Sequence, residues 1–156
     1  MRMVIVGAGA AGVSVAETIC KYSTVSEITV ISKESSLPYS PVALHEYIEG
    51  KIPKEQLFLW DDKFIKKKSI NLVLGKSVVN IQPRAKKIVM DDGSVLSYDK
   101  LLIASGASPI LPEDLINRKG VFTLRNYEGK AFTYHEPSFV PKKQEQVASK
   151  DSERAA

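Results

Sequence analysis

The sequence predicts an α/β fold whose parallel sheet begins with a strand, a helix and a second strand. Three observations lead to this expectation. The apolar run Arg2 to Val6 leads directly into the pattern G-x-G-x-x-G, which starts at Gly7. Residues 10–22 then repeat apolar side chains at helical spacing. Ile28 to Ile31 is again apolar without alternation, as expected of a parallel strand that is buried on both faces.

Each glycine of the pattern between the first strand and the helix has its own expected role. Gly7 permits a tight turn, Gly9 lets a pyrophosphate approach the backbone, and Gly12 lets the helix pack close to the strand. The helix that begins here would direct its free N–H groups and the positive end of its dipole at the phosphates. Because a strand precedes the pattern and a helix follows it, a dinucleotide site is favoured over a glycine-rich turn without a ligand.

Residues 32–68 predict a loop followed by short helices. Residues 32–41 are rich in Ser and Pro and are typical of a loop. Residues 42–50 predict a short helix that ends at Gly50, and Pro53 suits the first turn of another. Asp61 is placed to cap a helix that runs to Lys68, where lysines complement the helix dipole.

The remaining pattern up to residue 104 is that of strands. Residues 70–74 predict a third strand, and residues 78–81 begin a further one. Residues 86–90 and 95–97 flank an Asp-Asp-Gly-Ser turn, which predicts a small antiparallel hairpin. The run Leu101 to Ala104 is fully apolar and predicts a central parallel strand.

Composition and charge narrow the classes of function. The chain has 156 residues, 44% of them hydrophobic, which is enough for one globular core. The net charge of +4 is diffuse, so nucleic-acid binding is not expected. No apolar run approaches the roughly 20 residues that span a bilayer, and no secretory signal is visible, so we expect a cytoplasmic protein without a membrane partner. The single cysteine, Cys20, excludes an intramolecular disulfide and fits a core position.

The C-terminal part of the chain differs from the rest. Residues 131–156 contain scattered aromatic residues, prolines and charges of both signs, without helical or strand periodicity. We therefore expect a domain over residues 1–128 and a flexible, patternless tail over residues 129–156. His135 lies in this tail and is assigned no role.

Several motifs occur in a familiar order. They are the run Val4 to Gly12, the strand Ile28 to Glu34, the segment Pro38-Tyr39-Ser40-Pro41, the Asp-Asp-Gly hairpin and the run Leu101 to Pro109. Together they resemble the N-terminal FAD-binding part of the pyridine nucleotide–disulfide oxidoreductase superfamily, in the branch with NADH oxidases, rubredoxin and ferredoxin reductases and the nitrite reductase flavin module. The resemblance covers about residues 1–128 and implies a Rossmann-like FAD-binding domain.

The resemblance also implies roles for individual residues. The glycine turn would hold the FAD pyrophosphate, Glu34 would accept hydrogen bonds from the adenosine ribose, and the backbone of Val78 would contact the adenine. The loop at Ser40 and Pro41 would lie along the flavin side. The full set of expected cofactor-binding residues is Gly7, Gly9, Ala10, Ala11, Gly12, Ser32, Lys33, Glu34, Ser40, Pro41, Val78, Ala104, Ser105 and Gly106. The alternatives are a solvated loop acid for Glu34 and an ordinary strand-to-loop turn at residues 104–106.

The sequence departs from the pattern of the superfamily in three ways. Val42 occupies the position of the redox cysteine, and a valine cannot form a thiolate. A second G-x-G-x-x-G motif for NAD(P)H does not follow Arg125. A later Gly-Asp motif, which would bind the ribityl and phosphate groups, is also absent. We therefore expect a truncated form that lacks thiol chemistry and a hydride-donor site of its own.

Two main interpretations of function remain open. The chain is the FAD-binding domain or subunit of a flavin-dependent NAD(P)H oxidoreductase, with NAD(P)H bound by a missing domain or a partner subunit. Alternatively, it is a non-catalytic nucleotide-binding subunit or a truncated remnant that needs a partner chain. A small NAD-binding protein is a third possibility, less favoured because of the turn at residues 104–106 and the loop at residues 38–41.

The other residues with reactive, metal-ligating or aromatic side chains give only weak indications of a function. His45 is either a proton donor near the flavin or a surface residue at a helix end. No His, Cys or Asp cluster has metal-ligand spacing, so no metal is expected. Phe58 and Trp60 fit the role of apolar anchors better than that of a cofactor stack.

Overall fold

The computed structural model describes residues 1–23, 27–116, 118, 121 and 123–127. The chain divides into two compact units, Met1–Ser108 and Pro109–Ala156. The first unit contains every residue expected to bind the cofactor. In the second unit the described part includes a short 3-10 helix, η2 (Glu113–Leu115). The predicted tail over residues 129–156 lies outside the described residues.

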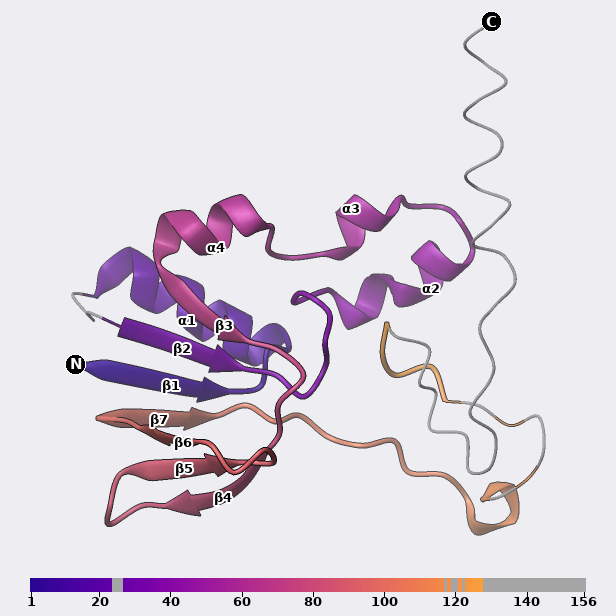
Figure 1. The fold of residues 1–156 in the computed structure, drawn as a ribbon. Coiled ribbons are helices and arrows are strands. Elements are labelled where there is room, and N and C mark those ends of the chain that lie inside the picture. The colour runs from indigo at the N-terminus through magenta and orange to yellow at the C-terminus, as the bar shows by residue number, and fades with distance from the viewer. Residues whose placement is uncertain (24–26, 117, 119–120, 122, 128–156) are drawn as a thin grey trace, which may run out of the picture. The chain divides into compact units, whose positions relative to one another are not determined.

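A parallel sheet forms the centre of the first unit (Figure 1). Its strand order is β3-β2-β1-β7, and each neighbouring pair is parallel. The strands are β1 (Arg2–Val6), β2 (Glu27–Ile31), β3 (Ile70–Val73) and β7 (Lys100–Ile103). The predicted α/β fold with a strand–helix–strand start is therefore confirmed.

The helices connect the strands and follow local sequence signals. They are α1 (Ala10–Tyr22), the 3-10 helix η1 (Pro41–Ala43), α2 (Leu44–Ile48), α3 (Lys54–Leu57) and α4 (Asp62–Lys68). Asp61 caps α4 as predicted, because its Oδ1 accepts a hydrogen bond from the Phe64 N–H at 2.6 Å. Pro53 precedes α3 as its N-cap rather than lying in its first turn.

A smaller antiparallel sheet covers one face of the parallel sheet. Its strands are β4 (Val78–Gln82), β5 (Lys87–Met90) and β6 (Val95–Ser97), in the order β4-β5-β6. The predicted hairpin is present as β5 and β6, and β4 adds a third strand to it. Gly93 adopts a φ of +81° in the connecting turn, which is a conformation that favours glycine.

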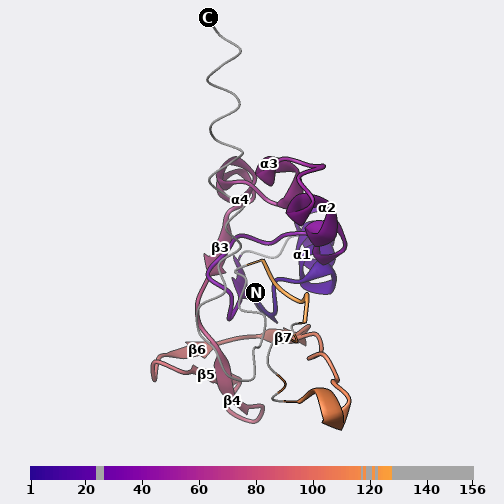
Figure 2. The ribbon, with the colours of Figure 1, turned by 90° about the vertical axis from the view of Figure 1, so that its right-hand side faces the viewer.

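Apolar side chains alternate between the two faces of the parallel sheet and form two cores. Ile5, Val30 and Trp60 belong to the core on the helical face. Val4, Ile31 and Ile88 belong to the core against the antiparallel sheet. Figure 2, turned by 90° from Figure 1, shows α1 and β4–β6 on opposite sides of the parallel sheet. Both faces of this sheet are thus covered, as parallel sheets require.

The position of β7 differs from the predicted central strand. Among the described residues β7 pairs only with β1, so it lies at an edge of the parallel sheet. The side chain of Ile103, its last residue, is 60% exposed. The run Leu101 to Ala104 is apolar enough for a central strand, but apolar composition does not determine how many neighbours a strand has.

Trp60 links the helices on one face of the sheet. It is 1% exposed, its Nε1–H donates to Glu17 Oε1 of α1 at 2.8 Å, and its ring stacks on Phe64 of α4 at a centroid distance of 5.7 Å. The predicted role of Trp60 as an apolar anchor agrees with this burial.

We predict that Trp60→Ala lowers the free energy of unfolding by about 3–5 kcal/mol, because a large core side chain is lost and a cavity remains. Leu59→Ala is the control, since Leu59 is 43% exposed. Urea unfolding followed by far-UV circular dichroism measures both variants. Circular dichroism is used because Trp60 is the single tryptophan of the chain, so Trp60→Ala cannot be followed by tryptophan fluorescence. Equal losses in the two variants would contradict the anchoring role.

Candidate nucleotide-binding site at the carboxyl edge of the parallel sheet

The four parallel strands end at one edge of the sheet, and loops from distant parts of the chain follow them. In Figure 1 the arrowheads of β1, β2 and β7 point toward the side where the chain continues to α2 and α3. Ligands of open α/β sheets bind in a crevice outside the carboxyl ends of the strands. This edge is therefore where the candidate site is built.

The turn after β1 is held by contacts that leave no room for a side chain on Gly7. Gly7 has a φ of +109°, and a Cβ on it would lie 2.1 Å from the carbonyl oxygen of Ala104. The Gly7 N–H donates to the carbonyl oxygen of Ile31 at 2.8 Å, and the Ala104 N–H donates to that of Val6 at 2.7 Å. The turns after β1 and β7 and the end of β2 thus meet at this glycine.

Gly9 and Gly12 have opposite surroundings. Gly9 is the exposed N-cap of α1, and a Cβ on it would meet no atom within 4 Å. A Cβ on Gly12 would lie 2.0 Å from the carbonyl oxygen of Gly7, so close packing of helix and strand requires glycine there. The open side of the turn is therefore at Gly9, which is where a ligand could approach the backbone.

The first turn of α1 presents unused hydrogen-bond donors. The first intrahelical bond at this end is donated by the Val13 N–H to the Gly9 carbonyl, at 3.0 Å. The N–H groups of Ala10, Ala11 and Gly12 precede it and have no intrahelical acceptor. The first turn carries no acidic side chain and no side-chain cap. Together with the helix dipole, these donors favour an anion such as a pyrophosphate.

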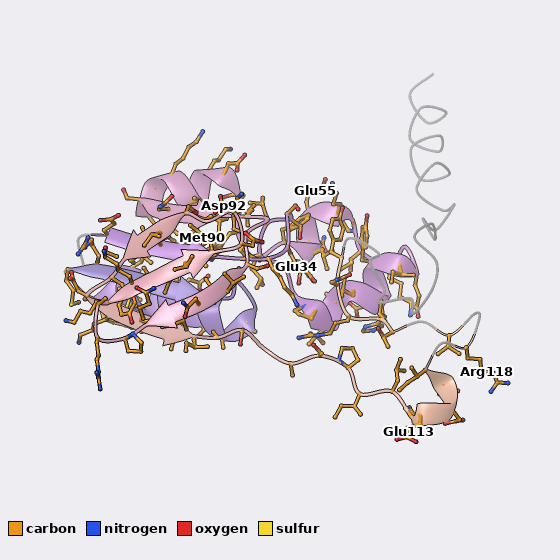
Figure 3. All side chains as sticks on the ribbon, turned by 60° about the horizontal axis from the view of Figure 1, so that its bottom comes forward. Glu34, Glu55, Met90, Asp92, Glu113 and Arg118 are labelled. Carbon is orange, nitrogen blue, oxygen red and sulfur yellow. The ribbon has the colours of Figure 1, made fainter. Side chains whose placement is uncertain are left out.

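The turn after β2 is fixed by hydrogen bonds to the segment after β3. The N–H of Ser32 donates to Val73 O at 2.8 Å, and the N–H of Gly75 donates to Glu34 O at 3.0 Å. The N–H of Glu34 donates to Ser32 Oγ at 3.2 Å. Ser32 is buried, Glu34 is half-buried, and Lys33 between them is exposed. Glu34 lies where the chain leaves the sheet toward α2 and α3 (Figure 3).

The Glu34 side chain has a partner that sequence reasoning did not assign. The Tyr39 hydroxyl donates to Glu34 Oε2 at 2.8 Å. Tyr39 belongs to the segment Pro38–Pro41, whose sequence does not predict a contact with Glu34. A tyrosine five residues after an acid, and directly after a proline, is the only sequence signal that could have indicated this pair.

The loop at residues 40–45 is anchored through its backbone. Ser40 is the N-cap of η1, and its N–H donates to Leu57 O at 2.9 Å, while Pro41 begins the helix. Val42 is 80% exposed. The Nδ1 atom of His45 lies 2.8 Å from the Val42 carbonyl oxygen. His45 is exposed and occupied with this carbonyl, as expected of a helix-end residue.

The other predicted site residues follow β3 and β7. Val78 is half-buried at the start of β4, where it pairs with Met90 of β5. Ser105 and Gly106 are exposed after β7, and Gly106 has a φ of +72°. The structure thus brings the turn at residues 104–106 against the glycine turn, through the contact between Ala104 and Gly7. Val78 packs, like Val6, against the core beside the antiparallel sheet.

A charged contact ties the turn between β5 and β6 to the same edge. The Lys76 Nζ lies 2.8 Å from Asp92 Oδ2, and the Lys76 N–H donates to Ser32 O at 3.0 Å. Asp92 also accepts hydrogen bonds from the N–H and the hydroxyl of Ser94. The hydrogen bond from Lys76, followed by those from Ser94, holds the pKa of the Asp92 carboxyl well below its usual range.

We predict that Asp92→Asn lowers the urea midpoint of unfolding at pH 7 and that this difference shrinks below about pH 4. The reason is that a carboxyl with a lowered folded-state pKa stabilises the fold above its unfolded pKa of about 3.9 and loses this effect as the pH falls through the folded value. Asp114→Asn, at an exposed position in the second unit, is the control. A difference between wild type and Asp92→Asn that is unchanged from pH 7 to pH 3 would contradict the assignment.

Cys20 lies away from this edge. It is on α1, ten residues after Ala10, which is about 15 Å along the helix. Its side chain packs against the core on the helical face, and partial burial raises the pKa of its thiol. A protonated, core-facing thiol is a poor nucleophile.

Among residues 1–23, 27–116 and the other described positions, no group of three or more His, Cys, Asp or Glu side chains could hold a metal ion. None of the helices that the structure describes is long and apolar enough to span a bilayer.

The sequence of the chain is similar to those of known proteins. The family model described as "Pyridine nucleotide-disulphide oxidoreductase" matches residues 1–143. An NADH oxidase of Methanocaldococcus jannaschii is 36% identical over 138 residues, covering 82% of this chain and 30% of the relative. The assimilatory nitrate reductase electron transfer subunit of Bacillus subtilis is 31% identical, covering 81% of this chain and 17% of the relative.

The fold has counterparts among solved structures. The NADH:rubredoxin oxidoreductase of Clostridium acetobutylicum superimposes with a TM-score of 0.70 and 28% identity, covering 81% of this chain and 33% of that chain. The chain therefore spans about a third or less of the length of the proteins that it matches.

Proposed function

Because the chain belongs to the pyridine nucleotide-disulphide oxidoreductase family, we propose that it binds FAD through the ADP half of the cofactor. The observation that carries this proposal is the junction at Gly7, where the turns after β1 and β7 meet beside the open backbone of Gly9. When bound, the flavin supplies reversible two-electron chemistry. The residues of this chain supply binding and orientation.

The glycine turn fits the pyrophosphate in three respects. The N–H groups of Ala10, Ala11 and Gly12 provide donors at the positive end of the α1 dipole. The free space around Gly9 lets two phosphates approach the backbone closely. The absence of an acidic residue in the first turn of α1 avoids repulsion of the anion.

The loops after β2, β3 and β7 fit the rest of the cofactor. Glu34 offers a carboxylate to the ribose hydroxyls, with Ser32 and Lys33 as neighbours in the same turn. The turn Ala104-Ser105-Gly106 reaches the glycine turn and offers a hydroxyl beside the phosphates. Its presence, and the loop at Ser40 and Pro41, favour FAD over NAD, as the resemblance to FAD-binding domains implies.

We further propose that the chain acts as the FAD-binding part of a flavin-dependent NAD(P)H oxidoreductase that does not use a redox-active cysteine. Val42 is an exposed valine and cannot form a thiolate. Cys20, on the far part of α1, is half-buried against the core on the helical face, and burial raises the pKa of its thiol. The 156 residues contain one G-x-G-x-x-G motif, so a separate domain or a partner subunit would supply the NAD(P)H site.

A non-catalytic nucleotide-binding subunit is the second candidate. The relative from Bacillus subtilis is named an electron transfer subunit, which supports assembly with a partner chain. The two candidates differ in whether NADH reduces the flavin on this chain alone.

We predict that the purified chain, supplied with FAD and passed through a desalting column, retains a flavin absorbance band. Reduction of this band by NADH without oxygen would support a complete reductase, whereas a band that stays oxidised would support the subunit. A colourless protein that takes up no FAD would overturn the FAD proposal. Retention of NAD in place of FAD would point to the third possibility, a small NAD-binding protein.

We predict that Gly9→Val weakens FAD binding at least about tenfold, or about 1.4 kcal/mol, because the branched side chain would fill the open space beside the α1 N-terminus. Thr18→Val is the matched control, since Thr18 is exposed on α1 two turns away. Flavin fluorescence titration measures affinity, and circular dichroism checks that each variant is folded. Unchanged affinity in folded Gly9→Val would rule out the expected pyrophosphate contact.

A further inference from the structure

We propose that Tyr39 is a positioning residue for the nucleotide: its hydroxyl holds the Glu34 carboxylate in the orientation that accepts the adenosine ribose hydroxyls. This inference rests on the proposed binding of FAD and adds a residue to it. The observation behind it is the hydrogen bond from the Tyr39 hydroxyl to Glu34 Oε2 at 2.8 Å.

The backbone around Glu34 is fixed on both sides. Its N–H donates to Ser32 Oγ, and its carbonyl oxygen accepts from the Gly75 N–H at 3.0 Å. These two bonds set where the side chain leaves the turn, but they do not set its rotamer. The Tyr39 hydroxyl supplies that third constraint at the end of the side chain.

Tyr39 is itself held independently of Glu34. It is 7% exposed, and its backbone forms an isolated antiparallel bridge with Phe58. The neighbouring bonds, Ser40 N–H to Leu57 O at 2.9 Å and Leu59 N–H to Pro38 O at 2.8 Å, continue this pairing. The phenol ring is therefore a fixed donor, and the carboxylate is the movable partner.

The bond to Tyr39 leaves the carboxylate able to bind a second ligand. An ionised carboxylate has two oxygens with about four acceptor sites, and the Tyr39 hydroxyl uses one of them. A ribose presents two adjacent hydroxyl donors. A carboxylate whose orientation is already fixed loses less conformational freedom when it accepts them, so the ribose binds more tightly.

The location of the pair agrees with a ribose contact. The Gly7 N–H donates to Ile31 O, which directly precedes the turn that carries Glu34. The glycine turn and the Glu34 turn are thus neighbours at the carboxyl edge of the sheet. A pyrophosphate at the first and a ribose at the second would belong to one ADP group.

The competing explanation is that the bond only ties the loop at residues 38–40 to the turn after β2. Such a structural role would affect the stability of the ligand-free protein without depending on the ribose. A positioning role requires that the effect of Tyr39 on binding disappears when Glu34 is removed, and that it depends on the ribose hydroxyls. A double-mutant cycle separates the two.

The experiment compares wild type, Tyr39→Phe, Glu34→Ala and the double variant of the full chain, each checked for folding by circular dichroism. Isothermal titration measures the affinity for FAD, for ADP and for 2′-deoxy-ADP. Tyr98→Phe is the matched control, because Tyr98 is also 7% exposed but lies in the core against the antiparallel sheet.

We expect Tyr39→Phe to weaken FAD and ADP binding roughly tenfold, as for one hydrogen bond to a charged group. We expect this effect to vanish in the Glu34→Ala background and to be smaller for 2′-deoxy-ADP. Affinities that match those of Tyr98→Phe, or an equal effect of Tyr39→Phe with and without Glu34, would overturn the positioning role. Wild type that binds neither FAD nor ADP would instead overturn the proposed function itself.

Discussion

The close approach of two backbone turns at Gly7 is the constraint on which the candidate site depends. The carbonyl oxygen of Ala104 occupies the space where a side chain on Gly7 would lie, and the carbonyl oxygen of Gly7 does the same for Gly12. The strand β1, the helix α1 and the end of β7 can therefore meet only because residues 7 and 12 are both glycine. This contact directs the N-terminus of α1 along the carboxyl edge of the sheet and leaves Gly9 as the open position.

The two layers around the parallel sheet support this edge through packing on both faces. The helical face is closed by α1 and α4, with Trp60 between them, and the opposite face is closed by the antiparallel sheet. The segment after β3 then connects the layers, because Gly75 and Lys76 bond to the turn after β2 and Lys76 also contacts Asp92. A nucleotide at the edge would thus be held by loops that are fixed by both cores.

The chemistry available to this chain depends on which polar and reactive groups lie at the carboxyl edge of the parallel sheet. This edge carries the N–H groups of the first turn of α1 and the Glu34 carboxylate, which accepts a hydrogen bond from Tyr39, whereas Cys20 lies on the far part of α1, half-buried against the core. This distribution suits a binding and orienting role for a cofactor. It is consistent with membership of an oxidoreductase family whose matched relatives are covered by this chain over only about a third of their length.

The sequence by itself determined the features that depend on neighbouring residues. The glycine pattern, the helical spacing of residues 10–22, the Asp61 cap of α4 and the Asp-Asp-Gly turn each act within a few residues, so local rules were sufficient. Only the tertiary structure decided the contacts between distant segments: Gly7 with Ala104, Lys76 with Asp92 and the edge position of β7. It also decided the pair of Glu34 and Tyr39, which are near in sequence but meet because Tyr39 is held by residues 57–59. The physical reason is that strand order and loop position result from packing both faces of the sheet together, and no local pattern encodes which neighbour that packing selects.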